Sequence, residues 1–360
     1  MPHSLISRWF RPEVLAMSAY HVADASHYIK LDAMENPFSW PKEIEAQWLE
    51  SLQNCAMNRY PDPEARALAQ QLRISNQLPD QAGILLGNGS DEIIQILLMA
   101  LNSDASVLAP EPSFVMYRQI ARSLGLRYHG IPLLTEDFSL DRARLMAAIA
   151  EHQPALIFLA YPNNPTGNLF DYDTLEAILQ TSQGLVVIDE AYAPFTDASF
   201  MSKLNAYPNL LVMRTVSKLG LAGLRLGFLA GNPLILEELN KIRLPYNINI
   251  LTQLTAKFAL EHEAFLLQQT RLLRQERETV FTALNALPGI QPYPSEANFI
   301  LFRSHKLSAD RLFNSLKQQG ILIKNLSPQG GMLDNCLRVT IGTSSENQAF
   351  LTALRNALTD

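Results

Sequence analysis

The stretch R-T-V-S-K-L-G-L-A-G-L-R-L-G-F, residues 214–228, sets one lysine among small and apolar side chains. Lys218 follows the apolar segment 209–213, and Arg225 stands further along between apolar neighbours. Burial in such surroundings disfavours the charged form of an amine, lowers its pKa and makes it a competent nucleophile for Schiff-base chemistry. A solvated loop lysine before a glycine-rich turn would have the same local sequence. The segments upstream therefore decide between these two interpretations.

Length, composition and charge are those of a globular protein with more than one domain. The chain has 360 residues, of which 48% are hydrophobic and 18% charged, and its formal net charge is −6. Single hydrophobic cores stop growing at about 250–300 residues, so we expect two domains. The negative net charge argues against nucleic acid or an anionic membrane surface as the main partner.

Cysteine content and apolar patterning exclude further classes of protein. Cys55 and Cys336 are too few for a disulfide framework or a metal site, which favours a reducing compartment. The N-terminal region carries Arg8, Arg11 and Glu13 and has no continuous apolar run, so we expect no signal peptide. No segment reaches the roughly 18 uninterrupted apolar residues of a membrane span. We therefore expect a soluble cytoplasmic protein with no metal and no membrane partner.

Short apolar runs alternate with helical patterns through the middle of the chain. The runs are rich in Val, Ile and Leu, which is typical of parallel strands that helices cover on both faces. In such sheets ligands bind beyond the carboxyl ends of the strands. The expected strands are residues 84–86, 105–109, 155–160, 185–188, 209–213 and 224–230.

The two ends of the chain have a different character. Pro37 and Pro41 interrupt the N-terminal region, which favours an extended arm rather than a packed unit. Residues 249–287 have the apolar spacing of one long helix with a solvated charged face. We expect an N-terminal arm and part of the small domain in 1–45, a large domain in 46–248 and a small α+β domain in 249–360.

The motif G-N-G-S-D-E-I-I at 87–94 has the pattern of a helix start that follows a turn. Ser90 is a natural N-cap, and Asp91 and Glu92 suit the positive end of a helix. Backbone N–H groups at such a start can bind a phosphate, although two acidic residues repel one unless a cation such as Arg225 lies near. A capped helix with nothing bound is the alternative.

Two polar motifs directly follow expected buried strands. Y-P-N-N-P-T-G at 161–167 places the amide of Asn164 at a strand end, and D-E-A-Y at 189–192 does the same for Asp189 and Tyr192. A carboxylate at the end of a buried strand is costly unless it is paired, and a cationic ring nitrogen would offset that cost. Turn chemistry for the first motif and a helix cap for the second are the alternatives.

Taken together, these groups fit a phosphorylated aromatic aldehyde with a pyridine ring. Pyridoxal phosphate needs a lysine for its Schiff base and an acid at the ring nitrogen, so that the ring acts as an electron sink. The chain offers both in Lys218 and Asp189, with a phosphate-binding helix start at 87–94.

P-N-N-P-T-G, D-E-A-Y and S-K followed by A-G-L-R-L-G-F resemble, in this order, the fold-type I pyridoxal-phosphate aminotransferases. The resemblance is closer to the histidinol-phosphate aminotransferases and extends from P-E-V-L-A-M-S-A-Y-H-V and K-L-D-A-M-E-N-P to L-R-V-T-I-G-T near the end. It implies an α/β fold, with a mainly parallel seven-stranded sheet between helices in the large domain, and a small α+β domain.

The implied reaction is amino transfer between L-glutamate and imidazole-acetol phosphate, a step of L-histidine biosynthesis that gives L-histidinol phosphate and 2-oxoglutarate. An aromatic amino acid aminotransferase and a threonine-phosphate decarboxylase of the same fold are alternatives. A regulator built on this fold would need a basic winged-helix module, which we do not expect here.

The resemblance also implies a role for each site residue. Lys218 would bind the cofactor covalently and carry a proton, Asp189 would hold the protonated pyridine nitrogen, and Phe114 would stack on the ring. Asn164 and Tyr192 would hydrogen-bond the phenolic oxygen of the cofactor. The phosphate would be bound by Ser90, Asp91, Ser217 and Arg225, and by Tyr60 reaching across a homodimer with shared active sites.

On the substrate side, the resemblance implies Arg338, Lys324 and Tyr20 as anion-binding residues. Two positions depart from the family pattern: Lys324 stands where relatives carry an arginine, and Met34 where asparagine is common. Lysine binds phosphate as a point charge without the fork of arginine. The cofactor prediction is therefore firmer than the substrate prediction.

Overall fold

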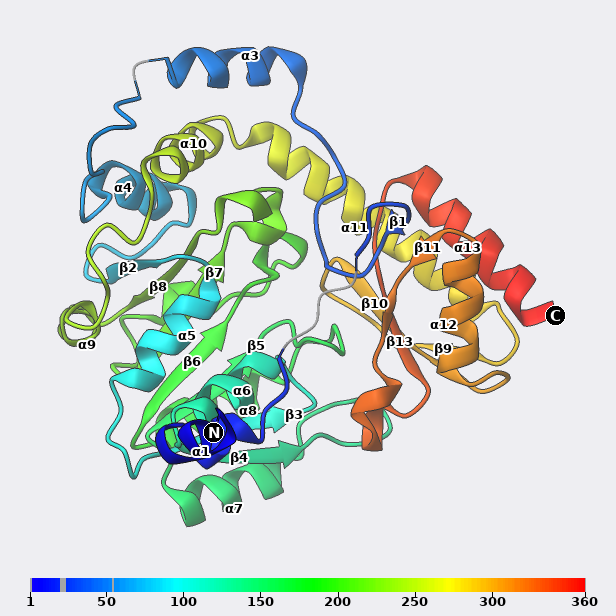
Figure 1. Ribbon diagram of the computed structural model, residues 1–360, viewed down its shortest axis with the longest axis horizontal. Coiled ribbons are helices and arrows are strands. Elements are labelled where there is room, and N and C mark those ends of the chain that lie inside the picture. Colours follow the sequence, from blue (N-terminus) through cyan, green and yellow to red (C-terminus); the bar gives the residue numbers. More distant parts are fainter. Residues whose placement is uncertain (1, 20–23, 54, 360) are drawn as a thin grey trace.

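The computed structural model describes residues 2–19, 24–53 and 55–359 and contains two large β-sheets that lie side by side. The long helix α11 (Ala264–Asn285) runs from the part built on the seven-stranded sheet to the part built on the four-stranded sheet (Figure 1). Within the described residues, no helix combines the length and the apolar character needed to cross a membrane.

The seven-stranded sheet has the strand order β2-β8-β7-β6-β5-β3-β4. Its strands are β2 (Gly83–Gly87), β3 (Ser106–Glu111), β4 (Arg127–Pro132), β5 (Leu156–Ala160), β6 (Leu185–Asp189), β7 (Leu210–Thr215) and β8 (Gly227–Gly231). Only β8 pairs antiparallel with its neighbours; the other pairs in this sheet are parallel. The prediction of a mainly parallel seven-stranded sheet is confirmed, with β4 as a strand that the apolar runs did not indicate.

Alternate side chains of each central strand enter two separate cores. In β5, Ile157 and Leu159 belong to one core, whereas Leu156 and Phe158 belong to the other. This division follows from the period of two along a strand. Each such fully buried side chain stabilises the fold by about 1.5–3 kcal/mol.

Helices cover both faces of this sheet, as the alternation of strands and helices predicts. One core is closed by α4 (Arg66–Ser75), α7 (Arg142–His152), α8 (Tyr172–Thr181) and α10 (Ile250–Glu261). The other is closed by α5 (Ser90–Met99), α6 (Val115–Ser123) and α9 (Pro233–Asn240). With both faces covered, a ligand can reach the sheet at the strand ends.

The four-stranded sheet is antiparallel and has its own core. Its order is β12-β13-β10-β9, with β9 (Ile290–Pro292), β10 (Phe299–Ser304), β12 (Lys324–Asn325) and β13 (Cys336–Thr340). Helices α12 (Ala309–Gln318) and α13 (Ser344–Thr359) pack on it through apolar side chains such as Leu312 and Phe350. A separate parallel pair joins β1 (Ile29–Lys30) to β11 (Ile321–Leu322), so the N-terminal segment lies against the C-terminal part.

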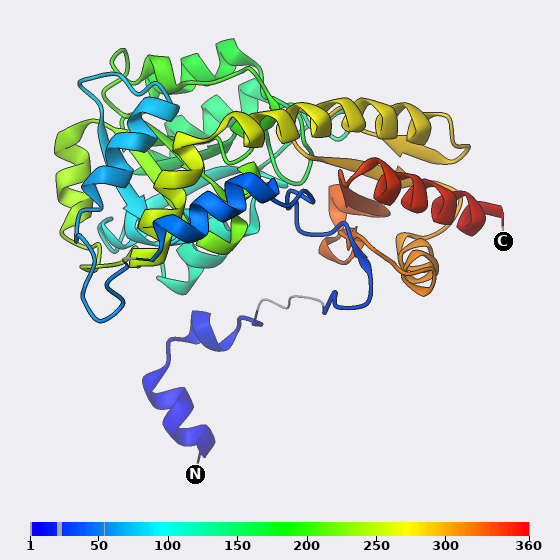
Figure 2. The ribbon, with the colours of Figure 1, turned by 90° about the horizontal axis from the view of Figure 1, so that it is seen from above.

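Two sequence predictions about the ends of the chain are wrong. Residues 1–45 are not simply extended: α1 (Pro2–Trp9) and α2 (Pro12–Leu15) are helical and project from the body, and α3 (Lys42–Ser51) follows later (Figure 2). Pro12 occupies the first helical position, where its missing N–H costs nothing.

The expected single helix over 249–287 is two helices, α10 and α11, separated at His262 and Glu263. The imidazole Nδ1 of His262 lies 2.8 Å from the carbonyl oxygen of Phe258, in the last turn of α10. A side chain that satisfies a terminal carbonyl allows a helix to end without glycine or proline.

Candidate active site

A cavity lies at the carboxyl ends of β5, β6 and β7 and encloses about 600 Å³, the solvent at its mouth included. This is where a parallel sheet is expected to bind a ligand. The cavity brings together most of the predicted cofactor residues. Its lining residues are Met34, Ser90, Asp91, Phe114, Ala160, Pro162, Asn164, Asp189, Ala191, Tyr192, Thr215, Ser217, Lys218 and Arg225.

Asp189, the last residue of β6, is buried in the floor of this cavity. Its Oδ2 accepts a hydrogen bond of 2.5 Å from the hydroxyl of Tyr117, and its Oδ1 accepts one of 3.0 Å from the N–H of Ala191. Burial raises the pKa of Asp189 to about 6, while these two hydrogen bonds lower it. A carboxylate held in this way has a fixed direction and is poised to meet a cationic group.

Lys218 lies in the short helix η3 (Ser217–Leu219) that follows β7, and its side chain enters the same cavity. The ammonium Nζ donates to the carbonyl oxygen of Ala33 over 3.2 Å and lies 5.9 Å from the centre of the Tyr192 ring. Burial, together with the positive charge of Arg338, lowers the pKa of Lys218 to about 8. Near neutral pH this amine is therefore much easier to deprotonate than an exposed lysine.

A chain of hydrogen bonds connects Arg338, Asn164 and Tyr192 across the cavity. Arg338 donates from Nη1 to Asn164 Oδ1 over 2.5 Å, and Asn164 donates from Nδ2 to the Tyr192 hydroxyl over 3.0 Å. Arg338 also donates to the carbonyl oxygen of Asp32, and its guanidinium carbon lies 5.2 Å from the centre of the Phe299 ring. Because Arg338 comes from β13 and Asn164 from the β5 end, this chain joins the two sheets at the site.

The predicted phosphate-binding helix start is present, with one correction. Helix α5 begins at Ser90, and Gly89 with φ +81° occupies the N-cap position, so the serine is the first helical residue and does not cap. A Cβ on Gly89 would lie 2.7 Å from Nη2 of Arg225, and one on Gly227 would lie 2.7 Å from the N–H nitrogen of Ser90. Both glycines are therefore needed for Arg225 and the helix start to approach each other.

Arg225 supplies the cation that the acidic helix start requires. Its Nη2 lies 3.4 Å from Oδ2 of Asp91, and both side chains are about half exposed. Ser217 faces the same region: its N–H donates to Thr215 Oγ1 over 3.1 Å, and the two hydroxyl oxygens lie 2.9 Å apart. The cavity thus has a positively charged end with several N–H and O–H donors.

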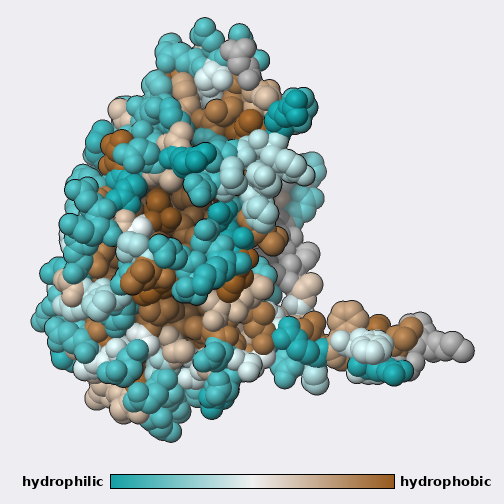
Figure 3. Space-filling model, turned by 90° about the vertical axis from the view of Figure 1, so that its left-hand side faces the viewer, coloured by the Kyte–Doolittle hydropathy of each residue, from teal (hydrophilic) through white to brown (hydrophobic). Residues whose placement is uncertain are grey.

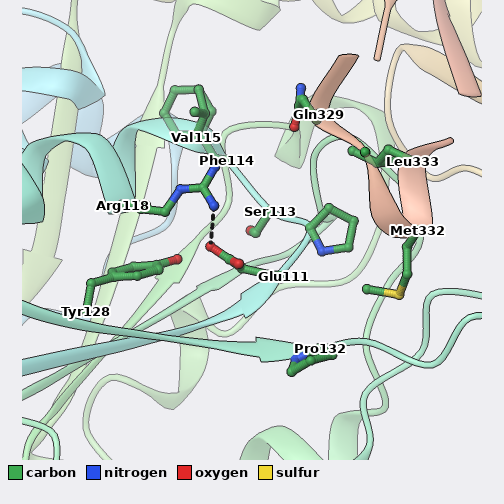
Figure 4. Close-up of a pocket in the computed structure, with 12 residues that line it drawn as sticks. Glu111, Ser113, Phe114, Val115, Arg118, Tyr128, Pro132, Gln329, Met332 and Leu333 are labelled. Carbon is green, nitrogen blue, oxygen red and sulfur yellow. Dashed lines mark ion pairs between the residues drawn. The ribbon is translucent and has the colours of Figure 1, made fainter. Parts of the chain in front are cut away.

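Phe114 lines this cavity and also a second one of about 710 Å³ (Figure 4). The second cavity lies between the β3–α6 connection and residues 329–333, and its charged groups are Arg118 and Glu111, paired at 3.3 Å. Burial raises the pKa of Tyr128, which also lines it. These groups neutralise one another and include no amine, so the cavity with Lys218 is the better candidate for catalysis.

Of the predicted residues that the structure describes, Tyr60, Lys324 and Arg338 are not part of the cavity lining. Tyr60 is 80% exposed and stacks on Tyr246 of the same chain, with ring centres 4.4 Å apart. Lys324 pairs in register with Arg338 on the neighbouring strand of the four-stranded sheet. Tyr20 lies outside the described residues.

Several lining or contacting residues were not predicted as site residues, among them Tyr117 and Thr215. Tyr117 lies one helical turn after Phe114, a spacing that could have indicated a shared face. Thr215 sits beside Ser217 in the motif itself. Met34, which the family pattern had marked on the substrate side, lines the cavity from a distant segment with φ +54°.

Comparison with known proteins places this geometry in a family. A family model for aminotransferase class I and II matches residues 26–354. Histidinol-phosphate aminotransferase 2 of Nitrosococcus oceani is 55% identical over 356 residues, which cover 99% of each chain.

Solved structures have the same fold. The crystal structure of the histidinol-phosphate aminotransferase from Clostridium acetobutylicum has a TM-score of 0.84 and 26% identity, over 92% of this chain and 99% of that one. The enzyme of the same name from Sinorhizobium meliloti, solved in complex with pyridoxal-5'-phosphate, has a TM-score of 0.85 and 22% identity, over 98% of both chains. The chain therefore belongs to the class I and II aminotransferases, and within them to the histidinol-phosphate aminotransferase family.

Proposed function

We propose that this chain is a pyridoxal-phosphate-dependent histidinol-phosphate aminotransferase. It exchanges the amino group between L-glutamate and imidazole-acetol phosphate, giving 2-oxoglutarate and L-histidinol phosphate in L-histidine biosynthesis. The observation that carries the proposal is a cavity lined by a lysine of lowered pKa and a buried carboxylate, with the buried guanidinium of Arg338 hydrogen-bonded to Asn164 of its lining. The 55% identity to a protein of that name supports the choice of substrate.

The cavity fits the cofactor at each end. Gly89 and Gly227 leave the room beside Arg225 and the α5 start that a phosphate needs, because a Cβ on either would collide there. At the other end, Asp189 is a buried carboxylate with a raised pKa, which a protonated ring nitrogen would stabilise. The groups that would hold the phosphate are Ser90, the N–H of Asp91, Ser217 and Arg225, with Tyr60 of the other subunit.

The residues of the cavity have distinct parts in the proposed reaction. Pyridoxal phosphate, when bound, supplies the electron sink for bond cleavage at the amino-bearing carbon. Lys218 takes the proton from that carbon and returns it, a task for which a pKa near the working pH is favourable. Asn164 and Tyr192, already hydrogen-bonded to each other, present their polar atoms to the phenolic oxygen, and Phe114 covers the ring.

Arg338 is the anchor for the anionic end of the substrate. Its planar fork suits the carboxylate of glutamate and the phosphate of histidinol phosphate alike. Because its Nη1 and Nη2 are held by Asn164 and by the carbonyl of Asp32, the guanidinium is oriented before substrate arrives. Lys324 and Tyr20 add positive charge and a hydroxyl for the phosphate alone.

The active unit in this proposal is a cytoplasmic homodimer with shared sites, and each chain divides into 1–45, 46–248 and 249–360. Exposed apolar side chains near Tyr60 and Tyr246 support the dimer, among them Leu49, Met57 and Leu244. The face that carries α4 and α9 also shows hydrophobic patches between hydrophilic ones (Figure 3). An exposed tyrosine pair is well suited to reach a neighbouring subunit's site.

The proposed function is tested by single-turnover reaction of the holoenzyme with separate amino donors. We expect histidinol phosphate and L-glutamate to discharge the visible band of the bound cofactor, and borohydride to fix the cofactor on the peptide that contains Lys218. Lys257→Ala, which alters a surface lysine paired with Glu261, is the matched control and should label like the wild type. Preference for phenylalanine or tyrosine, or release of CO₂ from threonine phosphate, would reject the substrate assignment. Label on another peptide would reject the role of Lys218.

A further inference from the structure

A buried ion pair lies directly behind the cavity, between residues that are sequence neighbours of the site. Arg214 contacts Oε2 of Glu190 with both Nη2, at 2.6 Å, and Nε, at 2.9 Å. The carboxylate side chain is fully buried, and the guanidinium side chain is 16% exposed. Because consecutive side chains point to opposite faces of a strand, the pair lies on the far side from Asp189 and Thr215, which line the cavity.

Further hydrogen bonds fix both partners of this pair. Glu190 Oε1 accepts from the N–H of Phe200 over 2.6 Å and from the hydroxyl of Ser199 over 3.0 Å. Arg214 Nη1 donates to Asn76 Oδ1 over 2.9 Å. Charge-assisted bonds of this length are strongly directional, so neither side chain can turn without breaking several of them.

The pair continues the connection between β6 and β7 beyond the point where their backbone pairing ends. The last partners in register are Asp189 and Met213, and the N–H of Glu190 donates to the carbonyl oxygen of Met213 over 2.8 Å. The next residues on the two strands are Glu190 and Arg214, which are joined through their side chains. Immediately before and after this junction lie Asp189 and the segment 215–218 that carries Lys218.

We propose that Glu190 and Arg214 are positioning residues, whose ion pair sets the relative placement of Asp189 and Lys218 and thereby the alignment of the cofactor between them. This inference rests on the proposed function. The electrostatics agree with it: the negative charge of Glu190 raises the pKa of Asp189, and Arg214 offsets that charge. Removing only Arg214 leaves Glu190 as an unpaired anion beside Asp189, whose carboxylate must stay ionised.

The test compares Arg214→Met, Arg214→Lys, Glu190→Gln and the double variant Glu190→Leu/Arg214→Met, all as holoenzymes. A misplacement of about 1 Å can reduce the rate about 100-fold, so each single variant should lose roughly 10- to 100-fold in kcat, with KM nearly unchanged.

The double variant should regain melting temperature, because replacing both charges leaves none unpaired, but it should not regain kcat. Arg214→Lys keeps the charge and loses the fork, so it should lose kcat without moving the pH midpoint of the cofactor band, whereas Arg214→Met should move it.

Arg277→Met is the control, because Arg277 is also a buried arginine, with a side chain 6% exposed, and it pairs with Glu296 rather than with the sequence neighbour of Asp189. It should lower the melting temperature and leave kcat unchanged. If the double variant regains kcat together with melting temperature, or if the single variants keep wild-type kcat, the positioning role is refuted. Melting temperature, the pH midpoint of the cofactor band and cofactor affinity are all measured without substrate. If the wild-type enzyme reacts with none of the amino donors, the proposed function is rejected, and these three measurements still test the positioning role.

Discussion

The two halves of the candidate active site are built in different ways. In the cofactor half, the polar groups come from strand ends of one sheet and find partners there, as Asp189 does with Tyr117 and Asn164 with Tyr192. In the substrate half, Arg338 comes from the four-stranded sheet, and the backbone carbonyl of Asp32 in the N-terminal segment accepts its hydrogen bond. One half is thus set by a single packed unit, and the other by the meeting of three segments.

This difference predicts how substitutions should act. A change in the cofactor half should damage reaction with every amino donor, because every donor uses the same cofactor. A change in the substrate half should separate one donor from another, since it alters only the groups that recognise the anion. Arg338 joins the two halves, so a change there should affect both substrate recognition and the cofactor half.

The largest effect is expected in the cofactor half, where Lys218→Ala should remove the proton carrier. Losing a general acid–base group lowers the rate at least about 10²–10⁴-fold, so this variant should be inactive while it still binds cofactor non-covalently.

Tyr60→Ala should also be inactive. If Tyr60 acts across a dimer, mixing the two variants creates one intact site in each hybrid, and about a quarter of wild-type activity should return. No recovery after verified subunit exchange would show that Tyr60 does not act across the dimer.

Arg338→Gln should show a smaller loss that extends to both donors. We expect about 2–4 kcal/mol in kcat/KM for glutamate and for histidinol phosphate, because a charged hydrogen bond to each anion is lost. The positive charge of Arg338 also lowers the pKa of Lys218, so the variant should raise that pKa above about 8. Cofactor attachment to cofactor-free enzyme needs the neutral amine and should therefore rise at higher pH than in the wild type. An unchanged pH profile would contradict the electrostatic link between the halves.

The smallest effect is expected for Lys324→Ala, which tests the substrate half alone. It should cost about 1–3 kcal/mol with histidinol phosphate and leave glutamate nearly unaffected, because this lysine is assigned to the phosphate only. Single-turnover rates with the two donors measure the difference directly. Lys317→Ala on α12, an exposed lysine outside the cavity, is the control. Equal losses for both donors would refute the division of labour between Lys324 and Arg338.

The cofactor half could be predicted from sequence because its motifs directly follow apolar strands. Asp189 and Asn164 stand at strand ends that the apolar runs marked, and parallel strands bring such ends together. The strand β4 escaped prediction because R-Y-H-G-I-P has no apolar run, as suits an edge strand that is only half buried. The break between α10 and α11 escaped because a histidine side chain, and not glycine or proline, satisfies the helix end.

The substrate half could not be predicted from local pattern. Nothing in L-D-A-M-E-N-P indicates that the carbonyl of Ala33 would meet Lys218, because that contact depends on how the N-terminal segment crosses the cavity. Arg338 was found only through the family resemblance, since an arginine in a short strand usually faces solvent. Its burial against Phe299 is a tertiary effect.

The pairing of β1 with β11 has a consequence for how the chain is made. Ile29 lies opposite Ile321, so β1 cannot find its partner on the ribosome until β11 has been made. Closing so long a loop is also entropically costly and slow. The seven-stranded sheet, by contrast, has all its strands by Gly231. The segment that carries Ala33 should therefore dock after the seven-stranded sheet has formed, and the active site should be completed only then.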